Sequence, residues 1–226
     1  MPGSIQHDRA FAAFLFDMDG TILDSIAVAN RIWSGWAVRH GLDPAEVLAA
    51  MHGVQVLQTV RRFAPAGLDA VAEAGAITEA EIEQADGVRE IAGAGRFLAL
   101  LPRDRWAIVT SAPRRLALRR IAAAGLPVPD VLVCAEDVAR GKPAPDCFLA
   151  AASALGVAAG QCLVWEDAPA GIAAGEAAGA AVIVIGATHA RAPETRHPVV
   201  RDYRDLGVRT DGDGALRLFD LPARPD

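Results

Sequence analysis

Two carboxylates, Asp17 and Asp19, lie two residues apart directly after an apolar run, and a glycine turn follows them. A strand ending at Asp17 would place this acid at the carboxyl edge of a sheet, with Asp19 in the loop just beyond, where open α/β folds bind ligands. One acid could act as a nucleophile and the other as a proton donor and acceptor, if their surroundings separate their pKa values. A divalent cation would screen their repulsion and attract a phosphate. The segment alone also fits an Asp-rich turn followed by a helix cap.

Lys142 is the only lysine in a chain of 226 residues that otherwise uses arginine as its strong base. It lies in the segment Gly-Lys-Pro-Ala-Pro-Asp at 141–146, just before an apolar helical pattern. A compact ammonium on a flexible stem suits a phosphate or a pair of carboxylates. The alternative is a solvated lysine left on a turn by an arginine-rich composition.

The elements that would position these groups are short apolar runs alternating with helical patterns. The runs of strand length cover 11–16, 106–111, 131–135, 162–165 and 181–185. Helical patterns cover 114–124, 146–155 and 170–178, and they stop at Gly125, Gly156 and Gly179. The alternation predicts an α/β fold with a doubly wound parallel sheet and helices on both faces. The carboxyl ends of its strands would gather Asp17, Thr110, Glu166 and Asp167 along one edge.

Residues 25–92 differ in character, because they show helical periodicity and almost no strand signal. We expect a helical cap over 25–92, inserted after the first strand of a core formed by 1–24 and 93–226. Such a cap would cover the carboxyl edge of the sheet and exclude water from it. Trp33 and Trp36 are expected to pack inside the cap. His52–Gly53 interrupts the helical pattern, which fits either a specificity loop or a simple helix junction.

Composition and charge narrow the class of protein. A net charge of −6 and a pI near 5.4, without a basic stripe, argue against a nucleic-acid surface. The arginine pairs at 61–62, 114–115 and 119–120 are interpreted as solvated helix faces. The chain has no membrane-spanning run of about 18 apolar residues and no signal-like N-terminus, so we expect a cytoplasmic protein.

Near the end, 208–210 and 215–218 flank a glycine-rich turn and predict a hairpin. The three cysteines, with no paired spacing, are interpreted as reduced core thiols.

Four segments resemble, in order and spacing, the signature motifs of the haloacid dehalogenase superfamily. They are Asp17-x-Asp19-Gly20-Thr21, Ile108-Val109-Thr110-Ser111, Gly141-Lys142-Pro143 and Trp165-Glu166-Asp167 with the following 168–172. Within this superfamily the chain most resembles bacterial sugar phosphatases and the glycerol-phosphate and 2-deoxyglucose-6-phosphate phosphatases. The similarity covers roughly 11–218.

The resemblance implies a magnesium-dependent phosphatase acting on small sugar or polyol phosphates. Asp17 would attack phosphorus to give an aspartyl-phosphate, and Asp19 would protonate the leaving oxygen and then activate water. Thr110 and the Ser111 amide would hold phosphate oxygens, and Lys142 would neutralise charge. Mg²⁺ would be held by Asp17, the carbonyl of Asp19, and Asp167. Glu166 would be a further ligand or would lie just behind the ligands.

Other reactions within the superfamily fit the residues less well. A dehalogenase needs no acid at Asp19, and a phosphonatase would need a lysine in the insert, which contains none. A β-phosphoglucomutase-like isomerase would carry an arginine where this chain reads Gly53-Val54-Gln55-Val56. A binding module without turnover would be expected to lose one of the acids. The resemblance implies a phosphorylated small-molecule ligand and is compatible with a monomer, but the sugar itself is not identified.

Overall fold

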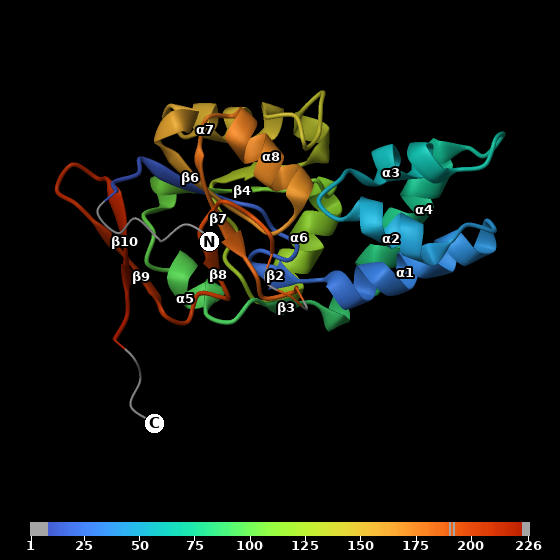
Figure 1. The fold of residues 1–226 in the computed structure, drawn as a ribbon, viewed down its shortest axis with the longest axis horizontal. Helices are drawn as coiled ribbons and strands as arrows, with labels where there is room; N and C mark the ends of the chain where they lie inside the picture. Colours follow the sequence, from blue (N-terminus) through green and yellow to red (C-terminus); the bar gives the residue numbers. More distant parts are fainter. Residues whose placement is uncertain (1–8, 190, 192, 223–226) are drawn as a thin grey trace.

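The computed structural model describes residues 9–189, 191 and 193–222 (Figure 1). Over these residues the core is a parallel sheet of six strands in the order β5-β4-β1-β6-β7-β8. The strands are β1 (Ala13–Phe16), β4 (Trp106–Val109), β5 (Val131–Val133), β6 (Cys162–Glu166), β7 (Ala181–Ile185) and β8 (Val199–Val200). The first five confirm the predicted strands. The last was missed because two apolar residues give too short a pattern to recognise.

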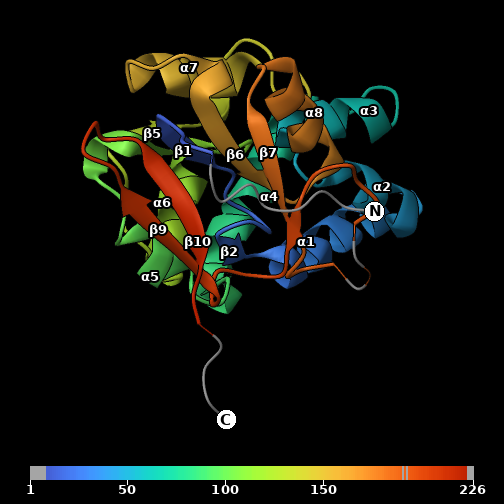
Figure 2. The ribbon, with the colours of Figure 1, turned by 60° about the vertical axis from the view of Figure 1, so that its left-hand side comes forward.

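Successive residues of the buried strands serve two different apolar cores. Phe14 and Phe16 of β1 face one core, whereas Ala13 and Leu15 face the other, as the period of two in a strand requires. Helices α5 (Ala94–Leu98) and α6 (Arg114–Ala123) contribute to the first core, and α7 (Asp146–Ala154) and α8 (Pro169–Ala177) to the second (Figures 1 and 2). The predicted layer of helices on each face of the sheet is therefore confirmed.

The prediction that three glycines end helices is also confirmed. Gly125, Gly156 and Gly179 follow α6, α7 and α8 with φ values of 68°, 69° and 77°. This left-handed conformation strains residues that carry a Cβ, so glycine is the residue that commonly ends a helix in this way. The three helix ends predicted from the sequence lie within a residue of those observed.

Residues 25–92 form a body of helices beside the core (Figure 1). It contains α1 (Ile26–Arg39), α2 (Pro44–Met51), α3 (Val56–Phe63) and α4 (Ala70–Glu83). Helix α4 starts at Ala70, because the Asp69 carboxylate accepts hydrogen bonds from the amides of Val71 and Ala72 and caps the helix there. Trp33 and Trp36 are buried, as expected, and Trp33 also lines the pocket described below.

The chain enters and leaves this helical body through a short ribbon. Strand β2 (Leu23–Asp24) pairs antiparallel with β3 (Arg89–Glu90). Neither strand was predicted, because each contains only two residues and lacks an apolar pattern. One of the two residues is exposed in β2, and both are exposed in β3. The ribbon lies next to the expected boundaries at 24/25 and 92/93, which remain predictions.

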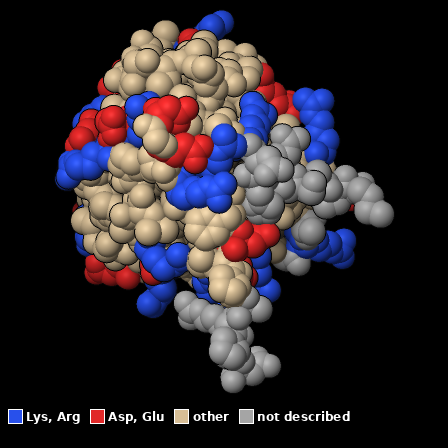
Figure 3. Space-filling view, turned by 90° about the vertical axis from the view of Figure 1, so that its left-hand side faces the viewer, with Lys and Arg blue, Asp and Glu red and all other residues tan. Residues whose placement is uncertain are grey.

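The last part of the described chain is the predicted hairpin, formed by β9 (Leu206–Thr210) and β10 (Leu216–Asp220). Phe11 pairs with Leu216, so the hairpin contacts the segment that leads into β1. Basic and acidic side chains are interspersed on the face of the molecule that Figure 3 shows, without a continuous basic surface there. None of the helices in the described residues is long and apolar enough to cross a membrane.

The cysteines Cys134, Cys147 and Cys162 are buried and unpaired with one another. Burial raises the pKa of Cys162 to about 11 and also raises the pKa of Cys147. Their thiols are therefore protonated and poorly reactive at neutral pH, in agreement with the interpretation as core thiols.

Candidate active site

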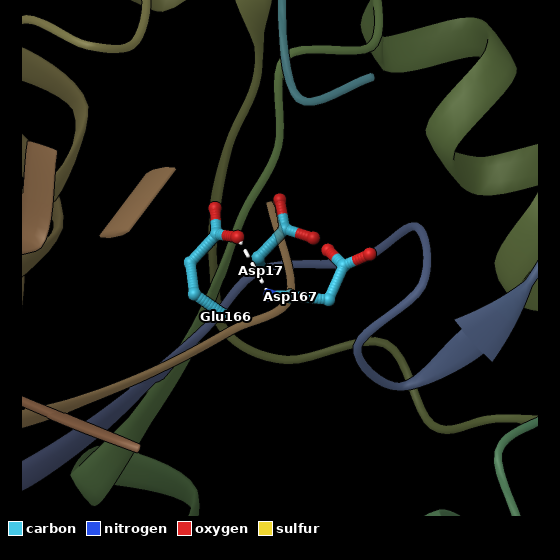
Figure 4. Close-up of side chains that lie close together, drawn as sticks. All are labelled: Asp17, Glu166 and Asp167. Atoms are coloured by element: carbon cyan, nitrogen blue, oxygen red, sulfur yellow. Dashed lines mark hydrogen bonds between the residues drawn. The ribbon is translucent and has the colours of Figure 1, made fainter. Parts of the chain in front are cut away.

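The centre of the site is a group of three buried acids at the carboxyl ends of β1 and β6. Asp17 follows β1, and its amide donates to the carbonyl of Trp165 over 2.9 Å. Because β1 and β6 are neighbouring parallel strands, this register brings Asp17 beside Glu166 and Asp167. Carboxylate oxygens of the three residues lie within 4.8 Å of one another, and Figure 4 shows the side chains converging.

Lys142 lies against two of these acids. Its Nζ is 2.5 Å from Asp17 Oδ1, 2.7 Å from Glu166 Oε1 and 3.2 Å from the carbonyl oxygen of Val109. The side chain is 1% exposed, so this ammonium is paired inside the protein and is not a solvated turn lysine. The alternative reading of the single lysine is thereby wrong.

The charges of this cluster do not balance. Burial and the charge of Glu166 raise the pKa of Asp17 to about 7, against the opposing effect of Lys142. Burial, followed by the charges of Glu166 and Asp17, also raises the pKa of Asp167 well above its usual range. One ammonium thus faces three buried carboxylates. Such an oxygen-rich site with excess negative charge fits a divalent cation such as Mg²⁺.

The three acids differ in how many of their oxygens the protein occupies. Glu166 is saturated, because Oε1 binds Lys142 and Oε2 accepts from the amides of Asp167 and Ala168, each at 2.8 Å. Within the described part of the chain, the Asp167 carboxylate receives one long hydrogen bond of 3.4 Å from Thr21 Oγ1, and His189 Nε2 lies 3.8 Å from its other oxygen. Asp17 and Asp167 are therefore better placed than Glu166 to give oxygens to a cation.

Gly20 allows the loop after β1 to approach Asp167. Its φ is +84°, and a Cβ at this position would lie 2.1 Å from Asp167 Oδ2. Both the backbone conformation and the close contact therefore require glycine. The glycine of the Asp-x-Asp-Gly-Thr motif thus keeps space for a carboxylate from a distant part of the chain.

Gly171 on α8 has the corresponding role for Glu166, since a Cβ there would lie 1.4 Å from Glu166 Oε1. We expect Gly171→Ala to displace Glu166, to lower stability by about 1–3 kcal/mol, and to reduce any activity that needs Lys142 in place. Thermal unfolding and turnover would be measured. Gly75→Ala is the control, because its Cβ meets no atom within 4 Å and the change should stabilise α4 by about 0.5–1 kcal/mol. Equal stability of the two variants would contradict the packing argument.

Asp19 lies at the border between the core and the helices of 25–92. Its Oδ1 accepts a hydrogen bond of 2.6 Å from Ser25 Oγ and one of 2.9 Å from Arg120 Nη1. The side chain remains 25% exposed, in contrast to the buried Asp17. The two acids of the motif therefore have different surroundings, which is the condition for different chemical roles.

Thr110 and Ser111 follow β4, the other neighbour of β1. The Thr110 hydroxyl is buried and accepts from the Ala112 amide at 3.0 Å. The Ser111 hydroxyl donates to the Gly53 carbonyl across a distance of 2.9 Å. The second contact ties the loop after β4 to the helical body, which the sequence did not indicate.

A pocket lies between the sheet edge and the helices, and both parts of the chain line it. The core contributes the predicted residues Asp17, Asp19, Thr110 and Ser111, and the helical body contributes Trp33, Met51, His52, Gly53 and Val54. His52–Gly53 is thus both the junction of α2 and α3 and a wall of the pocket. Burial lowers the pKa of His52, so this wall is uncharged at neutral pH.

Arg120 contradicts the interpretation of the arginine pairs as solvated helix faces. It is 5% exposed and binds Asp19 and Glu81. A signal was present, because Arg120 follows Leu116 by four residues and therefore lies on the apolar face of α6. The interpretation holds for Arg119, whose side chain is 38% exposed and pairs at 2.7 Å with the exposed Asp86 of the 3₁₀ helix η1 (Ala85–Gly87).

His189 is a second residue that sequence reasoning missed. Its Nε2 lies 3.0 Å from the carbonyl oxygen of Asp167 and 3.8 Å from a side-chain oxygen of the same residue. It follows β7 in an irregular segment, so no periodic pattern pointed to it. Only the folding of the loop after β7 brings it to the acids.

The sequence was compared with protein families and with known proteins. The family model of the haloacid dehalogenase-like hydrolases matches residues 11–179. Hexitol phosphatase A of Escherichia coli (strain K12) is 46% identical over 178 residues, covering 77% of this chain and 82% of the relative. Glycerol-1-phosphate phosphohydrolase 2 of Saccharomyces cerevisiae is 34% identical over 191 residues, covering 78% and 75%.

A solved structure has a similar fold. A hydrolase from Pseudomonas syringae superimposes with a TM-score of 0.71 at 25% identity, covering 80% of this chain and 87% of that one. With the family match and the identity to the two curated relatives, this places the protein in a known class. The chain belongs to the haloacid dehalogenase-like hydrolase family.

Proposed function

We propose that the protein is a Mg²⁺-dependent phosphatase that hydrolyses small sugar or polyol phosphates through an aspartyl-phosphate. The observation that carries this proposal is the pair Asp17 and Asp19 at one pocket, with Lys142 bound to the first acid at 2.5 Å. The names of the relatives, a hexitol phosphatase and a glycerol-1-phosphate phosphohydrolase, support small polyol phosphates as the substrate class.

In the proposed mechanism Lys142 holds one oxygen of Asp17, and Asp17 attacks phosphorus in line. A bond forms between the Asp17 carboxylate and phosphorus, while the bond from phosphorus to the sugar oxygen breaks. Asp19 gives a proton to this leaving oxygen. Asp19 then takes a proton from the water that attacks the phosphoryl group, so that inorganic phosphate leaves and Asp17 is restored.

The remaining residues of the site would bind the phosphoryl group and stabilise its charge. Thr110 and the amide of Ser111 are proposed to contact its oxygens, and Lys142 to neutralise it. This division of labour suits phosphoryl transfer, in which positioning and charge stabilisation are the main tasks of the protein.

Asp17, the carbonyl of Asp19, and Asp167 are proposed to hold Mg²⁺, with Glu166 behind them as the partner of Lys142. When bound, the ion would neutralise negative charge on the phosphate and on the acids. The raised pKa values of Asp17 and Asp167 support this assignment, because burial first and then the charges of the neighbouring acids disfavour their ionised forms, which a bound cation would stabilise.

Binding of Mg²⁺ is expected to weaken as the pH falls below about 7. The pKa of Asp17 is raised to about 7, so below this pH the ion must displace a proton, and the affinity should fall up to about tenfold per pH unit. Calorimetric titration with MgCl₂ at pH 6 and pH 8, each in two buffers of different ionisation enthalpy, measures both the affinity and the protons released. An affinity that is the same at both pH values would contradict the assignment of Asp17 as a ligand.

We further propose that residues 25–92 act as a cap on a core formed by 1–24 and 93–226. The pocket lined by both parts, and the contact of Ser111 with Gly53, support this division. The cap would exclude water and contact the part of the substrate that does not react.

The function is tested by measuring phosphate release from hexitol, hexose, pentose, glycerol and glycolate phosphates with MgCl₂. We expect turnover of polyol or sugar phosphates that EDTA abolishes and added Mg²⁺ restores. Conversion of a sugar phosphate to an isomer without phosphate release would instead support a mutase. Binding of sugar phosphates without any turnover would support a sensing module.

A further inference from the structure

A chain of three charged side chains, of which Arg120 and Glu81 are buried, connects the proposed cap to Asp19. Arg120 on α6 donates from Nη1 to Asp19 Oδ1 at 2.9 Å, and its Nη2 lies 3.2 Å from Glu81 Oε1 on α4. The side chains of Arg120 and Glu81 are 6% and 3% exposed. Glu81 belongs to the helical body and Asp19 to the loop after β1, so the guanidinium spans the boundary between them.

Neighbouring arginines of α6 show what is particular to Arg120. Arg115 pairs with Glu79, and Arg119 pairs with Asp86, so the same helix makes further ion pairs with the helical body. In each of these pairs both side chains are more than a third exposed, and such pairs contribute little to stability. Among these three arginines, Arg120 alone is buried and alone reaches an acid of the site.

The buried arrangement is unfavourable for a purely structural contact. Removing a guanidinium and a carboxylate from water carries a desolvation penalty that their attraction often does not exceed. Within the described residues the Nε of Arg120 also has no hydrogen-bond partner. The guanidinium of Arg120 is therefore held by its ion pairs with Asp19 and Glu81, although not all of its N–H groups are hydrogen-bonded.

We propose that Arg120 is a positioning residue that holds Asp19 for proton transfer, and that Glu81 fixes Arg120 from the cap. This inference rests on the proposed phosphatase function. The planar guanidinium can reach two acids at once, which a lysine ammonium does with less geometric control. Asp19 is then held in its working position when α4 is docked on α6, so proton transfer is coupled to the docking of the cap.

The role can be separated from a general structural effect by the leaving group of the substrate. An alkyl alcohol, such as a polyol, needs a proton from Asp19 as it leaves. p-Nitrophenolate leaves as a stable anion and needs no such proton. The value of kcat/KM reports the steps up to departure of the leaving group, so misplacing Asp19 lowers it for alkyl esters much more than for p-nitrophenyl phosphate.

The experiment compares kcat/KM of Arg120→Met for the best alkyl phosphate of the panel and for p-nitrophenyl phosphate, with MgCl₂ present. We expect a fall of about 100-fold or more for the alkyl ester, the usual size of a general-acid contribution, and a fall below about fivefold for the aryl ester. Arg119→Met is the matched control on the same helix, and both of its values should stay within about twofold of wild type. Falls of equal size for the two esters in Arg120→Met would overturn the proposal.

A second variant covers the case in which Arg120→Met leaves the buried Glu81 without its ionic partner and does not fold. Arg120→Met with Glu81→Gln removes both charges, and the same selective loss on the alkyl ester is expected. Wild-type activity on the alkyl ester in the double variant would overturn the proposal. Wild-type protein that hydrolyses neither ester would refute the proposed function itself, which is a separate outcome from equal losses in an active enzyme.

Discussion

Asp17→Asn is expected to abolish phosphate release from every ester, with a loss of at least about 10⁴-fold, as seen when an enzyme loses its nucleophile. The amide of asparagine is too weak a nucleophile to attack phosphorus. Its oxygen can still accept the hydrogen bond from Lys142, so the geometry of the site should persist. Phosphate release with saturating Mg²⁺ measures the effect.

The same variant should be at least as stable as wild type when no metal is bound. Asp17 is buried and its raised pKa shows that its negative charge is unfavourable there, while Lys142 keeps Glu166 as a partner. Thermal unfolding in EDTA checks this. Asp86→Asn, which changes an exposed acid of the helical body, is the control and should retain full activity. Residual turnover above about 1% of wild type in Asp17→Asn would contradict the assignment of the nucleophile.

Lys142→Met is expected to have the largest effect on stability. Burial lowers the pKa of Lys142, but the charges of Asp17 and Glu166 outweigh this effect and the net direction is upward. Removing the ammonium leaves two buried carboxylates without their partner, and breaking a buried ion pair in this way costs about 3–5 kcal/mol. Urea denaturation at pH 8, where the carboxyl groups of the unfolded chain are ionised, measures the loss of unfolding free energy. Turnover should disappear in the same variant.

Arg140→Met provides the matched control, because Arg140 is 72% exposed and pairs with Asp146 at the surface. Its stability should change by no more than about 0.5 kcal/mol. Lys142→Met combined with Glu166→Gln should recover part of the lost stability without recovering turnover. A Lys142→Met protein within about 1 kcal/mol of wild type would show that the acids do not depend on this lysine.

Much of the site could be predicted because local sequence encodes it. An apolar run that ends in acids predicts a strand with carboxylates at its end, and parallel strands bring such ends together. The positions of Asp17, Thr110 and the Glu166–Asp167 pair at one edge follow from this rule. Lys142 stood out by composition, and Gly125, Gly156 and Gly179 marked helix ends through a backbone conformation that belongs to glycine.

The sequence by itself thus determined the alternation of five core strands with helices, the family, and the acids at the sheet edge. Only the tertiary structure decided that Arg120 is buried against Asp19 and Glu81, that His189 returns to Asp167, and that Gly53 meets Ser111. The physical reason is that periodicity reports which face of an element is apolar, over a few residues at a time. Which distant charge or carbonyl meets that face depends on how the helical body docks on the sheet, and no local pattern records that docking.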